Sequence, residues 1–189
     1  MKVKSVIATI LAVTVLSAGI CVAADDNDGK RDKTRKMAAQ TLQDLYKLEP
    51  AAQAAIQKAA GYAVFNNTGV NLLLSTARGS GIAFNNGNKQ ETFMKMGSVG
   101  AGLGLGVKDY RAIFVFADEK ALNQFLDSGW SGSAQTDAAA KAGEKGAAYS
   151  GAVEVAPGVY VYEITKNGLA LQLTLQGTKY YKDDDLNKK

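Results

Sequence analysis

Residues 97–107 read Gly-Ser-Val-Gly-Ala-Gly-Leu-Gly-Leu-Gly-Val, and the spacing of these glycines decides how this part of the chain folds. From Gly100 to Gly106, glycine occupies every second position. Alternate side chains of a β-strand point to opposite faces, so the pattern predicts a strand with one bare face. Each interior glycine costs about 0.5–1 kcal/mol relative to alanine. We therefore expect a compensating contact, either a helix packed on the bare face or a sharp coil of the sheet, as in a small barrel.

The same stretch does not match the glycine loops that bind phosphate. A dinucleotide site requires G-x-G-x-x-G between a strand and a helix, and a P-loop requires G-x-x-x-x-G-K-[ST]. Here the glycines are two residues apart, and Lys108-Asp109-Tyr110 is typical of a turn into another strand. We interpret the stretch as framework.

Short apolar runs separated by turn residues surround this strand. They predict strands at 62–65, 70–74, 81–84, 92–107, 111–116, 159–164 and 169–175. Asn86-Gly87 and Asn167-Gly168 are typical of tight hairpin turns between such strands. Neighbouring strands joined by tight turns pair antiparallel, so most of the sheet is expected to be antiparallel.

Two regions have helical spacing instead. Ala38, Leu42 and Leu45 predict an N-terminal helix, and Pro50 begins a second one that runs to Ala60 and ends at Gly61. Asp118 is a typical N-cap for a short helix near 119–127, and Gly129 a typical end. The fold class is therefore α+β: a mostly antiparallel, strongly bent or barrel-like sheet with an N-terminal helical segment, in a single domain over residues 37–189.

The first 24 residues have the pattern of a secretory signal peptide. A basic start precedes an uncharged run over residues 5–22 and two alanines. A membrane anchor is the competing interpretation, because the run approaches the roughly 18 residues of a spanning helix. Lipidation at Cys21 is a third, disfavoured by Ile20 before it. Cleavage predicts a periplasmic or secreted protein without an integral membrane span.

Composition excludes several classes of function. The chain has no histidine, and its one cysteine lies in the predicted signal peptide, which excludes disulfides, thiol nucleophiles, histidine-dependent triads and the usual zinc sites. We expect no cofactor and no metal. Two of 22 basic residues precede the cleavage site, so the mature net charge is 20 minus 18, or +2, too small to indicate nucleic-acid binding.

Two basic features are candidate binding sites. Residues 25–36 form a polar leader whose first residues we expect to be irregular, and it holds the densest basic cluster: Lys30, Arg31, Lys33, Arg35 and Lys36. Arg78 stands beside Gly79 and Gly81 at the mouth of a predicted strand, where its guanidinium and backbone amides could converge on a phosphate. The alternatives are a solvated leader and an arginine on a solvated turn.

Five motifs, in order and spacing, resemble the SYLF domain, over about residues 37–187. They are Ala-Ala-Gly-Tyr-Ala-Val-Phe at 59–65, Ala-Arg-Gly-Ser-Gly at 77–81, Gly-Ser-Val-Gly at 97–100, Gly-Leu at 168–169 and Tyr-Tyr-Lys-Asp-Asp-Asp-Leu-Asn at 180–187. The chain departs from the family pattern at Asn66, where proline is usual, and over residues 71–76, which replace a Lys-Ala-Gly stretch and paired glycines.

The resemblance implies a lipid-binding module, found in eukaryotic endocytic adaptors and in exported bacterial proteins. Of the family's partners, which include phosphoinositides and actin, only anionic lipid head groups carry over to an exported protein. The basic leader matches the family's lipid-binding start. We therefore expect a non-catalytic protein that binds anionic lipid peripherally, through the leader and Arg78.

Two other functions stay open at this stage. A carboxylate-based hydrolase would use pairs among Asp109, Asp118, Glu119 and the aspartates at 183–185, although Asp118 is better explained as a helix cap and the aspartate triplet as part of a solvated tail. An envelope structural or stress protein would act through contacts with other envelope proteins, using Trp130 and a long surface loop over 131–148.

Overall fold

The computed structural model describes residues 26–68, 75–100, 110–132, 149–170 and 177–188 of the 189-residue chain. The described helices are α1 (Asp26–Leu48), α2 (Ala51–Lys58), α3 (Glu119–Ser128) and α4 (Asp184–Asn187). The described strands are β1 (Gly61–Thr68), β2 (Ser75–Asn85), β3 (Glu91–Gly100), β4 (Tyr110–Phe116), β5 (Trp130–Ser131), β6 (Val153–Ala156), β7 (Val159–Thr165), β8 (Gly168–Ala170) and β9 (Thr178–Lys182).

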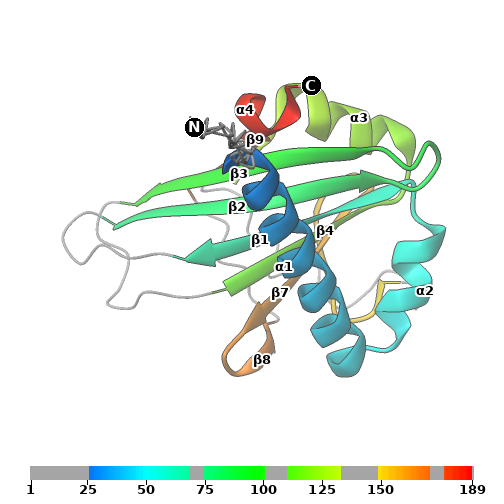
Figure 1. Cartoon of the computed structure of the whole chain (residues 1–189). Coiled ribbons are helices and arrows are strands. Elements are labelled where there is room, and N and C mark those ends of the chain that lie inside the picture. The colour runs from blue at the N-terminus through cyan, green and yellow to red at the C-terminus, as the bar shows by residue number, and fades with distance from the viewer. Residues whose placement is uncertain (1–25, 69–74, 101–109, 133–148, 171–176, 189) are drawn as a thin grey trace, which may run out of the picture.

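These strands form one curled antiparallel sheet (Figure 1). Their order is β5-β9-β3-β2-β1-β4-β7-β6, and β8 also pairs with β7. The turn after Asn85 joins β2 to β3, and the turn before Gly168 joins β7 to β8, as the hairpin signals predict. The predicted fold class, an α+β protein with a bent antiparallel sheet, is confirmed.

Helices cover both faces of the sheet. One face, the α1 face, packs Val64, Ile82 and Ile113 against α1 and α2. Figure 1 shows α1 lying across the strands of this face. The opposite face, the α3 face, packs an aromatic core against α3: Phe65, Phe114, Phe116, Phe125 and Tyr180. Each face is apolar where a helical layer packs on it.

The aromatic core requires glycine in β2. Gly81 is the register partner of Phe65 on β1, and a Cβ at Gly81 would overlap the ring of Phe65 and approach the carbonyl oxygen of Val64 to 2.7 Å. The ring of Phe65 lies over the backbone there and makes an edge contact with Tyr180, with ring centroids 4.7 Å apart. Gly81 thus shows a bare strand position against packed side chains, the arrangement that the sequence predicts for residues 100–106. That prediction itself stays untested, because residues 101–109 lie outside the described part.

Two boundaries differ from the sequence predictions. The first residues of the leader, expected to be irregular, are helical from Asp26 on, and residues 26–36 form the first half of α1. Asp26 and Asp28 stand at the positive N-terminus of the helix and pair with basic residues three or four positions later. Gly61 begins β1, since the second helix already ends at Lys58. The predicted signal peptide, the predicted strand at 70–74 and residues 133–148 of the predicted loop lie outside the described residues.

Candidate functional site

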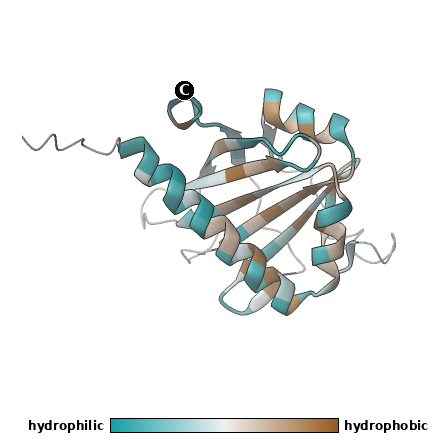
Figure 2. Ribbon diagram, turned by 45° about the vertical axis from the view of Figure 1, so that its right-hand side comes forward, coloured by the Kyte–Doolittle hydropathy of each residue, from teal (hydrophilic) through white to brown (hydrophobic). Residues whose placement is uncertain are grey.

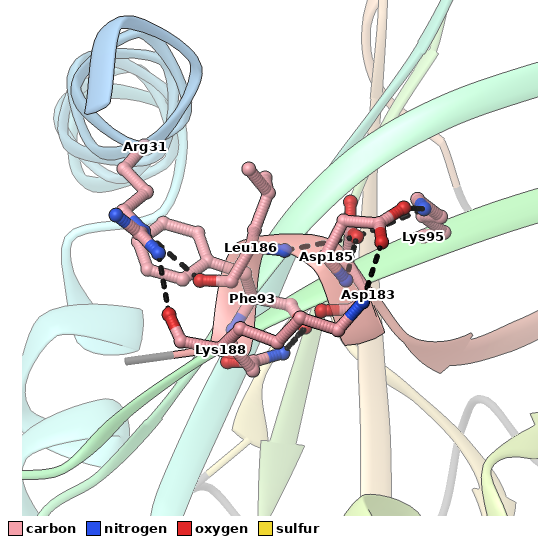
Figure 3. A network of polar contacts seen from close by, with 8 residues as sticks. Arg31, Phe93, Lys95, Asp183, Asp185, Leu186 and Lys188 are labelled. Carbon is pink, nitrogen blue, oxygen red and sulfur yellow. Dashed lines mark hydrogen bonds and ion pairs between the residues drawn. The ribbon is translucent and has the colours of Figure 1, made fainter. Parts of the chain in front are cut away.

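Arg31, predicted to bind lipid, holds the C-terminal segment in place (Figure 3). Its Nε donates to the carbonyl oxygen of Leu186 at 2.9 Å, and its Nη2 donates to that of Lys188 at 2.8 Å. Its Nη1 also pairs with Asp28, 2.7 Å away. The side chain is 20% exposed. Arg31 therefore has a structural role, because each of its three nitrogens already donates a hydrogen bond inside the protein.

Arg35 is fastened to the start of β3 in a similar way. Its Nε donates to Glu91 at 2.8 Å and its Nη1 to Asp32 at 3.0 Å. The guanidinium carbon lies 5.2 Å from the centre of the Phe93 ring, within the range of a cation–π contact. The hydrogen bond to Glu91 is the main reason that the pKa of Arg35 is raised. Only part of its surface remains open to a ligand.

The three lysines of the leader differ from the two arginines. Lys30 pairs with Asp26 within α1, and this hydrogen bond raises the pKa of Lys30. Lys33 and Lys36 are exposed and have no ion pair with any described residue. They belong to an outward stripe of α1, spaced by three and four residues, that contains no carboxylate: Gly29, Lys33, Lys36, Gln40, Gln43 and Lys47.

The apolar side of α1 is not free. Ala38 and Leu45 are buried against the sheet. In Figure 2 the N-terminal turns of α1 are hydrophilic. The helix therefore presents charge to solvent, while its hydrophobic residues belong to the core of the domain. No helix within the described ranges is long and apolar enough to cross a membrane.

Arg78 lies inside β2 and not at the mouth of a strand. It is the register partner of Thr68 on β1 and of Gly97 on β3. Its backbone is part of the sheet, so the expected convergence of free amides on a phosphate does not occur there. Gly79 is glycine because a Cβ would overlap the carbonyl oxygen of Asn66. The side chain of Arg78 is exposed and forms no ion pair within the described part of the chain.

A second exposed cation, Lys179, stands across Gly97 from Arg78. Lys179 is the register partner of Gly97 on β9. Phe93 packs on the α1 face, and Gly97 lies four residues further along β3, so the alternation of the strand places Gly97 on the same face. Sequence reasoning missed Lys179 because it predicted no strand at β9 and interpreted the aspartate triplet after it as part of a solvated tail. Thr178 and Tyr180 are buried, and Lys179 between them is exposed. This alternation of side chains is the signal that could have identified the strand and with it Lys179.

One member of the aspartate triplet, Asp183, is buried and structural, whereas Asp184 and Asp185 are exposed, as expected of a solvated tail. Asp183 is 6% exposed, caps α4 by accepting from the amides of Asp185 and Leu186, and pairs with Lys95 at 2.8 Å (Figure 3). The hydrogen bond to Asp183 is the main reason that the pKa of Lys95 is raised. The C-terminal segment is ordered because its caps and carbonyls find partners on α1 and β3.

The carboxylates considered for a hydrolase do not form a pair in the described structure. Asp118 accepts a hydrogen bond from the amide of Ala121 and caps α3, as predicted. Asp183 caps a different helix, and Asp109 lies outside the described residues. No group of three or more metal-ligating side chains gathers among residues that the structure describes. Trp130, considered as a contact surface, is half-buried against Phe114 and Tyr180.

Fold and surface together define an α+β domain built on one curled antiparallel sheet, which displays unpaired cations on α1 and on the α1 face. Residues 97–189 match a family described as Ysc84, Las17-binding protein actin regulator. Beta cell expansion factor A from Aeromonas veronii is 32% identical over 166 residues, which cover 84% of this chain and 61% of that protein. The chain belongs to the SYLF (Ysc84) family, and the resemblance noted in the sequence is confirmed. It spans less than two thirds of that relative's length.

Proposed function

We propose that this SYLF-family protein binds anionic membrane lipids at their head groups, peripherally and without catalysing a reaction. The observation that carries the proposal is the outward stripe of α1, where Lys33 and Lys36 are exposed and form no ion pair in the described structure. No residue of the stripe carries a negative charge that would compensate these two lysines. An anionic surface can therefore lie against the stripe.

The binding is electrostatic. Each basic residue near an anionic membrane surface contributes about 1 kcal/mol, and salt screens the attraction over roughly 10 Å at 0.1 M. The apolar side of α1 is packed in the core, so insertion of this helix into the acyl region is not part of the proposal. Affinity should therefore fall steeply as ionic strength rises.

Vesicle flotation tests this function. The full chain without residues 1–24 is mixed with phosphatidylcholine vesicles that contain phosphatidylglycerol, at low and at high salt. We expect binding at low salt that weakens by about 25-fold in the variant Lys33→Gln/Lys36→Gln, at about fivefold per charge. The matched control, Lys58→Gln/Lys120→Gln, removes two exposed lysines from α2 and α3. The proposal fails if the full protein does not float, or if both double variants bind equally.

The place of action proposed here is the periplasm or the cell exterior, which the signal pattern of residues 1–24 supports. Mass spectrometry of the protein recovered from cell fractions tests it. A mature chain that begins at Asp25 in the periplasm or medium is expected. An uncleaved chain in the membrane fraction would support the anchor interpretation instead.

Protein binding is a second candidate, favoured by the family description, which names Las17 binding. On this chain the partner would be an envelope protein, and the exposed stripe of α1 would serve as the contact. Crosslinking in cells followed by purification distinguishes the two. A crosslinked partner that is lost in Lys33→Gln/Lys36→Gln, together with absent vesicle flotation, would favour this second function.

A further inference from the structure

We infer that a row of three residues on the α1 face, Arg78, Gly97 and Lys179, is a second lipid contact that receives the phosphate of a membrane phospholipid. The three stand side by side on adjacent strands, because Gly97 is the register partner of both cations. Strands lie about 4.8 Å apart, so the two cations rise from backbones about 10 Å apart with glycine between them. This inference rests on the proposed function and adds a site to it.

Gly97 leaves open space between the cations. A Cβ built at this position meets no atom within 4 Å, in contrast to Gly79 and Gly81, where it would overlap neighbouring atoms. The core therefore does not require glycine at position 97, and the absence of a side chain keeps the space between Arg78 and Lys179 accessible. A phosphate needs such access, because two long cationic side chains must both reach it.

The charges of the row are uncompensated. Arg78 and Lys179 are exposed, and neither has an ion pair in the part of the chain that is described. Nearby cations on β3 and β9 are paired: Lys95 with Asp183, and Lys182 with Asp127. The electrostatic attraction for an anion on this part of the sheet therefore comes from Arg78 and Lys179.

An exposed aromatic side chain favours a membrane over free phosphate. Tyr181 is 41% exposed and follows Lys179 by two residues on β9, so both side chains lie on the same face of the sheet. Tyrosine is enriched at the head-group level of membranes, where its ring and its hydroxyl both find a suitable environment. Two free cations beside an exposed tyrosine fit an anionic membrane surface.

The test introduces a charge where the structure has room for it. Gly97→Glu places a carboxylate between the two cations, and Gly97→Gln is the neutral control of nearly the same shape. Binding to phosphatidylcholine vesicles that contain phosphatidylglycerol should weaken about fivefold in Gly97→Glu relative to Gly97→Gln, the effect of one charge near the surface. Pure phosphatidylcholine vesicles should bind neither. Circular dichroism and thermal unfolding check that both variants fold.

A second variant keeps the test independent of position 97. Arg78→Gln/Lys179→Gln removes two exposed charges and should weaken binding about 25-fold. If Gly97→Glu equals Gly97→Gln, or if the double variant binds like the full protein while Lys33→Gln/Lys36→Gln is weakened, the row is not a lipid site and the proposed function stands. If the unmodified protein does not bind anionic vesicles, the proposed function fails and this inference with it. If Arg78→Gln/Lys179→Gln loses the binding of inorganic phosphate but still binds vesicles like the unmodified protein, the row binds free phosphate and the membrane assignment is overturned.

Discussion

The Nε of Arg31 donates a 2.9 Å hydrogen bond to the carbonyl oxygen of Leu186, a residue 155 positions later in the chain. The N-terminal helix and the C-terminal segment are thus one structural unit. A basic residue that the sequence suggests for lipid binding thus satisfies backbone carbonyls at the end of the chain. Lys33 and Lys36, which follow it, form no ion pair in the described structure.

Replacing Arg31 tests this role. Arg31→Ala removes two hydrogen bonds to carbonyl oxygens, and Arg31→Lys offers one ammonium in place of a planar fork. Charge-assisted hydrogen bonds contribute about 1.5–3 kcal/mol when buried, so for this partly exposed residue we expect Arg31→Ala to lower the free energy of unfolding by about 1–2 kcal/mol, with little rescue by lysine. Urea unfolding measures the change. An unfolding free energy equal to that of the unmodified protein would contradict the role.

Much of the fold is readable from local patterns. The strands around Val64 and Ile113, the hairpin at Asn86 and the cap at Asp118 are where the sequence predicts them, because alternation, turn residues and caps each act within a few positions. Gly81 also lets the ring of Phe65 lie close over β2.

The candidate site was less predictable, for two physical reasons. The leader has the composition of a disordered segment, yet it folds because Arg31 and Arg35 find partners at Leu186 and Glu91, far away in sequence. The juxtaposition of Arg78 with Lys179 depends on strand register, which composition does not specify and which a shift of one residue would invert.

Two glycines of the same sheet should respond oppositely to alanine. Gly81→Ala forces a Cβ into the ring of Phe65 and toward the carbonyl oxygen of Val64, so we expect a loss of about 1–3 kcal/mol in the free energy of unfolding. Gly97→Ala meets no atom and restricts the unfolded chain, so we expect a gain of about 0.4–1 kcal/mol. Chemical unfolding of both variants measures the difference. Equal effects at the two positions would contradict the packing of Phe65 over β2.

Substitutions of Asp183 should separate its two roles, the cap of α4 and the ion-pair partner of Lys95. Asp183→Ala removes both the cap of the helix and the partner of Lys95, whereas Asp183→Asn keeps an acceptor for the amides of Asp185 and Leu186. We expect a loss of about 1–2 kcal/mol for alanine and a smaller loss for asparagine. Thermal and urea unfolding report the order. A loss for asparagine as large as for alanine would mean that the ion pair and not the cap stabilises the C-terminal segment.

Tyr162 should make the fold sensitive to alkaline pH. The side chain is fully buried, its hydroxyl has no hydrogen-bond partner among described residues, and burial raises its pKa to about 12. The unfolded chain loses this proton near pH 10, so the stabilising effect of the protonated form is complete below pH 10 and is lost as pH rises toward 12.

Tyr162→Phe isolates this effect, because it removes the ionisable group and leaves the ring in the core. At pH 7 we expect a stability equal to or up to about 1 kcal/mol above that of the unmodified protein, since an unpaired buried hydroxyl is removed. Between pH 9 and pH 11 the unmodified protein should lose about 1 kcal/mol more than Tyr162→Phe, the linkage of one group with a pKa raised from 10 to about 12. Urea unfolding at the two pH values measures both. Parallel losses in the two proteins would show that the Tyr162 hydroxyl ionises equally in the folded and unfolded chains.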